Sequence, residues 1–396
     1  MWVPVAGLPP RLALSAFSGA GRFCILSSGA ARWKDVPARN RRGLSDFQPQ
    51  LLPSESFRDL PAWVSKGRFE SRRYIISPRL AETVVQFLLK QDDCKMVLEF
   101  NPGPGILTQA LLQRGATVIA VESDKTFIPH LESLGKKLGG KLHVLHCDFF
   151  KLDPRSYGVM KPIVNSKLLF QDFGIKTLPW SKGIPLKVVG IFPTKNEKKM
   201  IWKLLHDIYS CTSLYRYGRV ELNLFINEMD CQKIMANPQN PNLYHALSVL
   251  WQVACEIKLL HVEPCSSFDI HTQSGQLEKP EWRESSEQQR QQNLCFIQLT
   301  PRRNLFTKNL TPVNYDVFFH MLKQCFMKRN AKLIDHLNSL SPIDAMDILK
   351  KIKQKKTTKI TKMYPEDFKH LFETIECSQN YTCKWLYDDF MEEVVI

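Results

Sequence analysis

The stretch VLEFNPGPGILTQALL, at residues 97–112, constrains the fold of this 396-residue chain more than any other. An apolar run leads into a turn that holds Gly103 and Gly105, and a helical pattern follows at once. Continuous apolar strands that alternate with helices are typical of a parallel sheet covered on both faces. In such sheets, ligands bind beyond the carboxyl ends of the strands. The stretch therefore predicts an α/β fold with a ligand site at this turn.

The same alternation continues along the chain. Apolar strand patterns recur at 117–123, 142–148, 186–192 and 220–227, with helical patterns between them. Two later runs, 256–262 and 294–300, predict an antiparallel pair at one side of the sheet, and helical patterns alone follow Thr311. The organisation that we predict is a leader at 1–45, a linker at 46–70, an α/β domain at 71–305 with an insertion or long loop at 151–185, and a helical domain and tail at 306–396.

The leader is rich in arginine and poor in acids, since seven basic residues accompany a single acid, Asp35. That composition is typical of a mitochondrial transit peptide, and a plain N-terminal tail is the alternative. The formal net charge of +15 favours a polyanionic partner, most simply nucleic acid. No apolar run reaches the length of a membrane span, so we expect no membrane partner. The 11 cysteines show no zinc spacing, so we expect reduced thiols and no metal site.

Three predicted strands end in an acidic residue: Glu99, Glu122 and Asp148. Glu122 follows the glycine turn at close to the spacing of about 20 residues at which a carboxylate binds ribose hydroxyls. The pattern E-x-x-x-G-x-G differs from the dinucleotide pattern G-x-G-x-x-G, which favours a ligand without phosphate, S-adenosylmethionine. Asp148 would accept a hydrogen bond from the adenine amine, with Phe149 against the base. A purely structural role for these glycines and acids remains the alternative.

Four segments together carry a resemblance to a known family: RRYIISP at 72, LEFNPGPGILTQALL at 98, YHALSVLWQ at 244 and FMKRNAKL at 326. Over residues 72–340 they resemble the rRNA adenine dimethyltransferase family, which dimethylates two adjacent adenosines in a small-subunit rRNA hairpin. The resemblance implies a Rossmann-like S-adenosylmethionine-dependent methyltransferase fold with a small C-terminal all-helical domain. It also implies a cofactor site formed by Ile75, Glu99, Asn101, Gly103, Gly105, Glu122, Asp148 and Phe149.

The family's catalytic motif, N-L-P-Y, is degenerate in this chain. Ile191, Phe192, Pro193 and Thr194 stand at its four positions. Isoleucine can neither donate nor accept a side-chain hydrogen bond, and threonine offers no aromatic face to a flipped base. Backbone carbonyls and a nearby Phe149 or Phe150 would serve instead in a weakened enzyme. We therefore expect methyl transfer to be weak rather than absent.

Two functions remain open at this point. The leader and the insertion resemble a mitochondrial branch of the family whose members assist the mitochondrial RNA polymerase. That branch implies promoter DNA and the mitochondrial high-mobility-group transcription factor A as further partners, in the nucleoid of the mitochondrial matrix. The alternative is an active dimethyltransferase that modifies small-subunit rRNA.

Three basic residues, Lys328, Arg329 and Lys332, lie in the segment that resembles a basic helix of the family. They predict contact with a nucleic-acid backbone, and a solvated helix face is an equal alternative. The lysine run at 350–362 reads as a solvated connection. The aromatic and acidic segment at 381–396 is either a partner-docking element or a cap on the helical domain.

Overall fold

The computed structural model describes residues 73–90, 95–139, 141–153, 165–193, 197–270, 293–378 and 384–386. All of them belong to one compact unit that spans residues 63–386. Several sequence-based expectations lie outside the described residues. They are the transit peptide at 1–45, the linker at 46–70, part of the insertion, Thr194, and the tail from residue 387 onward.

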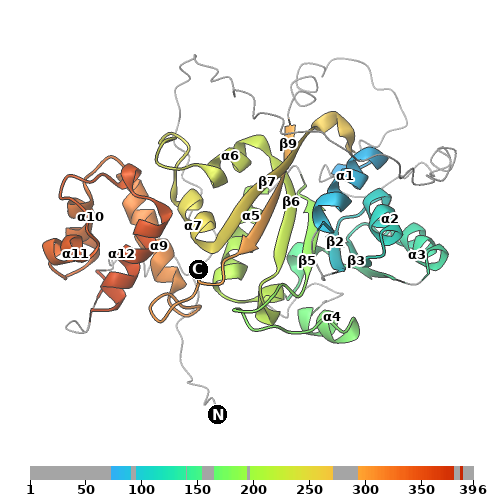
Figure 1. Cartoon of the computed structure of the whole chain (residues 1–396), viewed down its shortest axis with the longest axis horizontal. Helices are drawn as coiled ribbons and strands as arrows, with labels where there is room; N and C mark the ends of the chain where they lie inside the picture. The colour runs from blue at the N-terminus through green and yellow to red at the C-terminus, as the bar shows by residue number, and fades with distance from the viewer. Residues whose placement is uncertain are drawn as a thin grey trace, which may run out of the picture. The chain divides into compact units, whose positions relative to one another are not determined.

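Within the described residues, a seven-stranded mixed sheet forms the centre of the fold (Figure 1). In spatial order its strands are β4 (Leu142–His146), β3 (Thr117–Glu122), β2 (Met96–Phe100), β5 (Lys187–Ile191), β6 (Glu221–Asn227), β9 (Asn293–Pro301) and β7 (Cys255–Pro264). The first five are parallel, and β9 runs antiparallel to both of its neighbours. The predicted antiparallel pair is therefore confirmed. The chain order reverses between β2 and β5, which is where such sheets bind ligands.

Helices connect these strands. They are α1 (Pro78–Leu88), α2 (Ile106–Gln113), α3 (Ile128–Lys137), α4 (Ser166–Asp172), α5 (Glu197–Tyr209), α6 (Glu228–Met235) and α7 (Ala246–Ala254), with short 3₁₀ turns η3 (Phe149–Lys151), η4 (Ser213–Tyr217) and η5 (Cys265–Ser267). A second, two-stranded sheet joins β1 (Arg73–Ile75) to β8 (Phe268–Ile270). No helix in the described part of the chain is long and apolar enough to cross a membrane.

The first helix illustrates how the sequence sets its own boundaries. The hydroxyl of Ser77 accepts a hydrogen bond from the Leu80 amide at 3.3 Å, and Pro78 occupies the first helical position. Proline is favoured there because its missing N–H would have no partner in the first turn. The apolar side chains of this helix recur on one face and are buried, among them Leu80, Val84 and Leu88.

The predicted insertion holds more regular structure than its sequence suggested. We predicted an insertion or long loop across 151–185, but α4 forms there, with the Asn165 side chain capping its first turn. The ring of Phe170 stacks on Tyr217 with 3.9 Å between centroids. The Trp180 indole donates to the Arg302 carbonyl at 3.0 Å. These partners lie far along the sequence, so local periodicity gave no sign of the packing.

The C-terminal part is helical, as predicted. It comprises α9 (Tyr315–Met327), α10 (Leu333–Leu340), α11 (Ala345–Lys351), the 3₁₀ turn η6 (Ile360–Lys362) and α12 (Pro365–Glu376). One continuous cluster of buried apolar residues runs from the sheet into these helices. The hydroxyl of Tyr244, just before α7, also donates to the Met363 carbonyl at 2.8 Å. The α/β class with a helical C-terminal part is confirmed, and the domain boundaries stay predictions.

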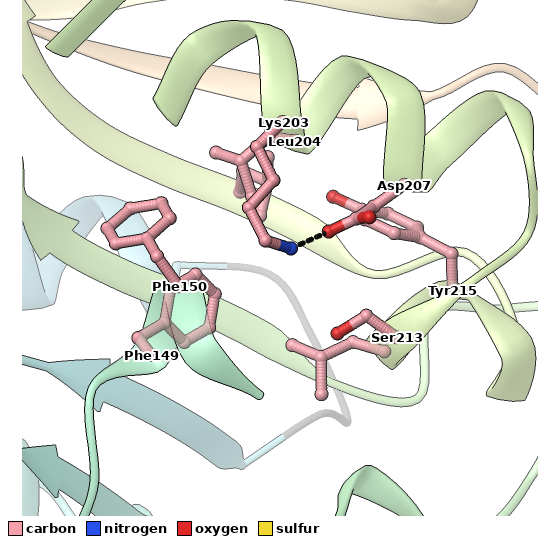
Figure 2. A pocket seen from close by; sticks show the side chains of 9 residues that line it. Phe149, Phe150, Lys203, Leu204, Asp207, Ser213 and Tyr215 are labelled. Carbon is pink, nitrogen blue, oxygen red and sulfur yellow. Dashed lines mark hydrogen bonds and ion pairs between the residues drawn. The ribbon is translucent and has the colours of Figure 1, made fainter. Parts of the chain in front are cut away.

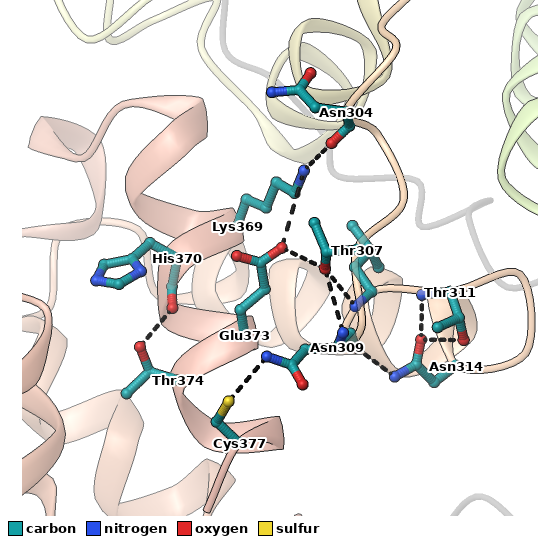
Figure 3. A network of polar contacts seen from close by, with 11 residues as sticks. Asn304, Thr307, Asn309, Thr311, Asn314, Lys369, His370, Glu373, Thr374 and Cys377 are labelled. Carbon is teal, nitrogen blue, oxygen red and sulfur yellow. Dashed lines mark hydrogen bonds and ion pairs between the residues drawn. The ribbon is translucent and has the colours of Figure 1, made fainter. Parts of the chain in front are cut away.

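The segment that connects β9 to α9 is attached to α12 by polar contacts (Figure 3). The Lys369 ammonium donates to the Asn304 carbonyl, and the Thr307 hydroxyl donates to Glu373 at 2.8 Å. Farther along, the Asn309 amide donates to the thiol sulfur of Cys377 at 2.9 Å. Hydrogen bonds from the connecting segment to α12, and from α12 to the connecting segment, therefore hold the two together.

The surroundings of Trp385 show which of the two predicted roles, partner docking or capping of the helical domain, applies to this residue. Its side chain is only 6% exposed and stacks on Phe372 with 5.4 Å between centroids. Its indole N–H donates to Glu376 at 2.6 Å. Trp385 therefore belongs to the core of the helical part. Tyr387 and Phe390 lie outside the described residues.

Candidate functional site

The glycine turn between β2 and α2 depends on backbone conformations with positive φ. The φ angles are +51° at Asn101, +57° at Gly103 and +78° at Gly105. Asparagine adopts this left-handed region more readily than most residues with a side chain. The Asn101 side chain also accepts a hydrogen bond from the Ser123 hydroxyl at 3.1 Å. Asn101 therefore adopts the left-handed conformation that this turn requires.

The ring of Tyr74 covers this turn. A methyl group built at Gly103 would lie 2.1 Å from a ring carbon of Tyr74, so only glycine fits. Tyr74 comes from β1, is 4% exposed and meets Phe127 edge to face at 5.1 Å. Sequence reasoning did not select Tyr74. Its place in RRYIISP, beside the predicted Ile75, was the available signal.

Two buried carboxyl groups flank the turn. Both oxygens of Glu122 accept backbone N–H groups, from Gly103 at 2.9 Å and from Asp124 at 2.8 Å. A carboxylate oxygen can accept more than one hydrogen bond, so these contacts are compatible with ligand hydroxyls as well. Glu99 is 3% exposed and accepts from the Thr108 hydroxyl at 2.7 Å.

The environment of Glu99 favours its neutral form. Burial is the main cause that raises the pKa of this carboxyl to about 8, and the charge of Glu122 raises it further, while the Thr108 hydrogen bond lowers it. A low-dielectric site disfavours a second negative charge beside an existing one. Glu99 therefore keeps its proton to a higher pH than an exposed carboxyl group does.

The predicted adenine contacts have structural partners of their own. Asp148 caps η3 by accepting from the Phe150 amide at 3.0 Å. Phe149 is 5% exposed and stacks on Phe100 with 4.7 Å between centroids and 15° between planes. Most of the Phe149 ring is therefore covered by protein.

The degenerate motif lies at the end of β5, beside the end of β2. Ile191 is 6% exposed and pairs with Phe225 of β6. Phe192 is 1% exposed, and its ring packs against Phe100 and Phe150 at 6.2 and 5.5 Å. Pro193 is buried as well. This corner is apolar and filled by aromatic side chains.

The structure assembles one predicted set and places the other elsewhere. The glycine turn contains Asn101, Gly103 and Gly105, and Glu122 contacts it through the Gly103 amide. Glu99 contacts Thr108 of α2, the helix that follows the turn. In contrast, Lys328, Arg329 and Lys332 lie between α9 and α10. Lys328 and Lys332 are exposed, and Arg329 is half-buried near His245. Burial chiefly lowers the pKa of His245, and the positive charge of Arg329 lowers it further.

A separate small cavity lies between α5, η4 and the Phe149–Phe150 pair (Figure 2). Lys203 and Asp207 form an ion pair at this cavity. The buried Tyr215 hydroxyl has no hydrogen-bond partner among the described residues. Among all the residues that the structure describes, no group of three or more His, Cys, Asp or Glu side chains could hold a metal ion.

Known proteins resemble this chain along most of its length. A family model described as ribosomal RNA adenine dimethylase matches residues 66–376. A Bos taurus protein named "Dimethyladenosine transferase 2, mitochondrial" is 62% identical over 100% of both chains. The Homo sapiens protein of the same name is 59% identical over 99% of this chain and 100% of its own. A crystal structure of a dimethyladenosine transferase from Plasmodium falciparum superposes with a TM-score of 0.51, covering 75% of this chain and 95% of that one, at 17% identity, which indicates a shared fold.

Proposed function

The chain belongs to the ribosomal RNA adenine dimethylase family, and we propose that it serves as a mitochondrial transcription initiation factor. In this role it works with the mitochondrial RNA polymerase to melt promoter DNA and to stabilise the open strands. Mitochondrial transcription factor A is a further partner, and the site of action is the nucleoid in the matrix. The word "mitochondrial" in the names of its full-length relatives supports the compartment.

The family and the fold imply S-adenosylmethionine binding, and the residues at the glycine turn fit this cofactor. Glu122, at the end of β3, would offer its carboxylate oxygens to the two ribose hydroxyls. The turn from Asn101 to Gly105, together with Ile75, would hold the amino-acid end. Asp148 would accept a hydrogen bond from the adenine amine, beside Phe149. When bound, the cofactor supplies an electrophilic methyl group.

The observation that carries the proposal is the apolar acceptor corner. An adenine amine must be held and aligned before it can attack a methyl group, and loss of such alignment costs orders of magnitude in rate. Ile191 offers no polar group for this purpose, and Phe192 is buried. Phe149 and Phe150 pack edge to face at 5.1 Å, so each ring already has an aromatic partner. The corner therefore supports a scaffold whose methyl transfer is weak.

Two measurements test this function. Calorimetric titration with S-adenosylmethionine, paired with methyl transfer to an rRNA hairpin, should give binding with little transfer. Transcription by the mitochondrial polymerase on duplex and premelted promoters should show that the chain helps the duplex template more. Equal help on both templates would refute a role in melting.

A second candidate is an active dimethyltransferase of two adjacent adenosines in mitochondrial small-subunit rRNA. The glycine turn favours this function, because its Gly103 amide donates to Glu122 and the Thr108 hydroxyl of the following helix donates to Glu99. The printed name of the full-length relatives points the same way. Rapid double methylation of the hairpin would establish this candidate and reject the first one as the main role.

A further inference from the structure

The helix α3 packs against the glycine turn, both directly and through Tyr74. A methyl group built at Gly105 would lie 3.0 Å from the Leu131 side chain of α3, so helix and turn are in close contact there. The ring of Phe127, at the start of the same helix, meets Tyr74 edge to face, and Tyr74 in turn covers Gly103. The position of α3 therefore bears on both glycines of the turn.

A further contact from α3 to the turn is polar. The ring of His130, which is half-buried, donates a hydrogen bond to the backbone carbonyl of Pro104. Burial is the main cause that lowers the pKa of His130, the hydrogen bond to Pro104 raises it, and the charge of Lys137 lowers it further. A neutral imidazole still carries one ring N–H, so this hydrogen bond does not require a protonated histidine.

The bond from His130 fixes one peptide group of the turn. The Pro104 carbonyl and the Gly105 N–H belong to the same peptide plane, and that N–H donates to the Pro102 carbonyl at 3.1 Å. Rotation of this plane changes ψ of Pro104 and φ of Gly105. Glycine accepts φ angles of either sign, so Gly105, at +78°, opposes such a rotation less than another residue would. His130 and Pro102 therefore hold the plane through its two polar groups.

The N–H groups of the glycine turn are already engaged by the protein. The Asn101 N–H donates to the Val121 carbonyl of β3 at 2.9 Å, and the Gly103 N–H donates to Glu122 at 2.9 Å. Gly105 donates as described above, and the two prolines of the turn have no N–H. The turn in this conformation therefore offers acceptors, which suit an ammonium group. Rotation of the peptide plane would free the Gly105 N–H and change this pattern.

We propose that His130 is a positioning residue for the cofactor: by holding the Pro104 carbonyl, it keeps the glycine turn in the conformation that receives the amino-acid end of S-adenosylmethionine. The proposal rests on the cofactor binding described under the proposed function. His130 acts through the backbone of the turn. Asn101 gives this support its importance, because a residue with a Cβ at a φ of +51° makes the turn less stable by itself than glycine would.

The test is a calorimetric titration of the full-length chain with S-adenosylmethionine. His130→Leu removes the donor and keeps an apolar side chain on α3. It should raise the dissociation constant about fivefold, the equivalent of one net hydrogen bond of about 1 kcal/mol, because only molecules with the ordered turn bind the cofactor. His130→Gln and His130→Asn each place an amide N–H near the reach of one ring nitrogen. The variant whose amide reaches Pro104 should restore most of the affinity.

The matched control is His143→Leu, the same substitution at another half-buried histidine. His143 lies in β4, and its ring packs against Phe173 with 4.4 Å between centroids. This control should bind the cofactor as the wild type does. If His130→Leu binds as tightly as the control, the proposal is wrong. A loss of affinity that neither amide variant repairs would show a merely structural role for His130 and would overturn the proposal as well.

Amide hydrogen exchange at Gly105, measured without cofactor, provides a second readout. Exchange should be faster in His130→Leu than in the wild type and slower again in the amide variant that restores binding. An equal exchange rate at Gly105 in His130→Leu and the wild type would refute the proposed support of the turn.

The two levels of the proposal fail in different ways. A wild type that binds S-adenosylmethionine while His130→Leu binds it equally well refutes only the role of His130. A wild type that does not bind S-adenosylmethionine refutes the cofactor binding and the role of His130 together. Transcription from the duplex promoter, measured without the cofactor, tests the proposed initiation role separately from both.

Discussion

Substituting Gly103 by alanine should destabilise the chain more than the same substitution at a glycine that has open space around its missing Cβ. Two costs combine at this position. A φ of +57° disfavours a residue with a Cβ by about 1–2 kcal/mol. The added methyl group would also lie 2.1 Å from the Tyr74 ring, and overpacking of this kind costs about 1–3 kcal/mol. We therefore expect Gly103→Ala to lower the free energy of unfolding by about 2–5 kcal/mol, measured by urea denaturation.

Gly115 provides the control that separates the two costs. Its φ is +82°, but a methyl group there would meet nothing within 4 Å. Gly115→Ala should therefore cost about 1–2 kcal/mol, from the backbone conformation alone. In a double-mutant cycle, Tyr74→Ala should reduce the cost of Gly103→Ala by the steric part, since it removes the ring that the methyl group meets. Equal costs at Gly103 and Gly115, with no coupling to Tyr74, would refute the reasoning.

Three further predictions concern the pH response, the acceptor corner and the tail. Because burial raises the folded-state pKa of Glu99 from 4.5 to about 8, the folded chain binds more protons than the unfolded chain between these values. The free energy of unfolding should thus fall more between pH 5 and pH 8 in the wild type than in Glu99→Gln, and equal pH dependence in urea titrations would contradict it. Joint replacement of Ile191→Asn and Thr194→Tyr should raise methyl transfer to an rRNA hairpin by about tenfold or more; an unchanged rate would mean that other positions limit it. Trp385→Ala should cost about 3–5 kcal/mol, whereas a chain that ends at residue 386 should keep its thermal transition; an unchanged transition in Trp385→Ala would exclude its role in the core.

The sequence determined the parts of this protein that depend on local order. The strand, the glycine turn and the helix at 97–112 were predictable because apolar spacing and positive-φ residues act over a few positions. The acids near the carboxyl ends of two strands, Glu99 in β2 and Glu122 in β3, were predictable for the same reason. Parallel strands place their carboxyl ends at one edge of the sheet, so consecutive strand ends converge on one site.

Tertiary structure decided which side chains those local elements meet. Nothing near Trp385 in the sequence shows that it stacks on Phe372, and nothing near Phe149 shows that Phe100 covers its ring. Likewise, 26 intervening residues separate Lys332 from Lys359, yet a backbone bridge places their charges side by side. Such contacts depend on how distant elements pack, and burial and repulsion act on whichever groups are brought together. A single sequence records the charge and size of each side chain, whereas its neighbours are set by the folded chain.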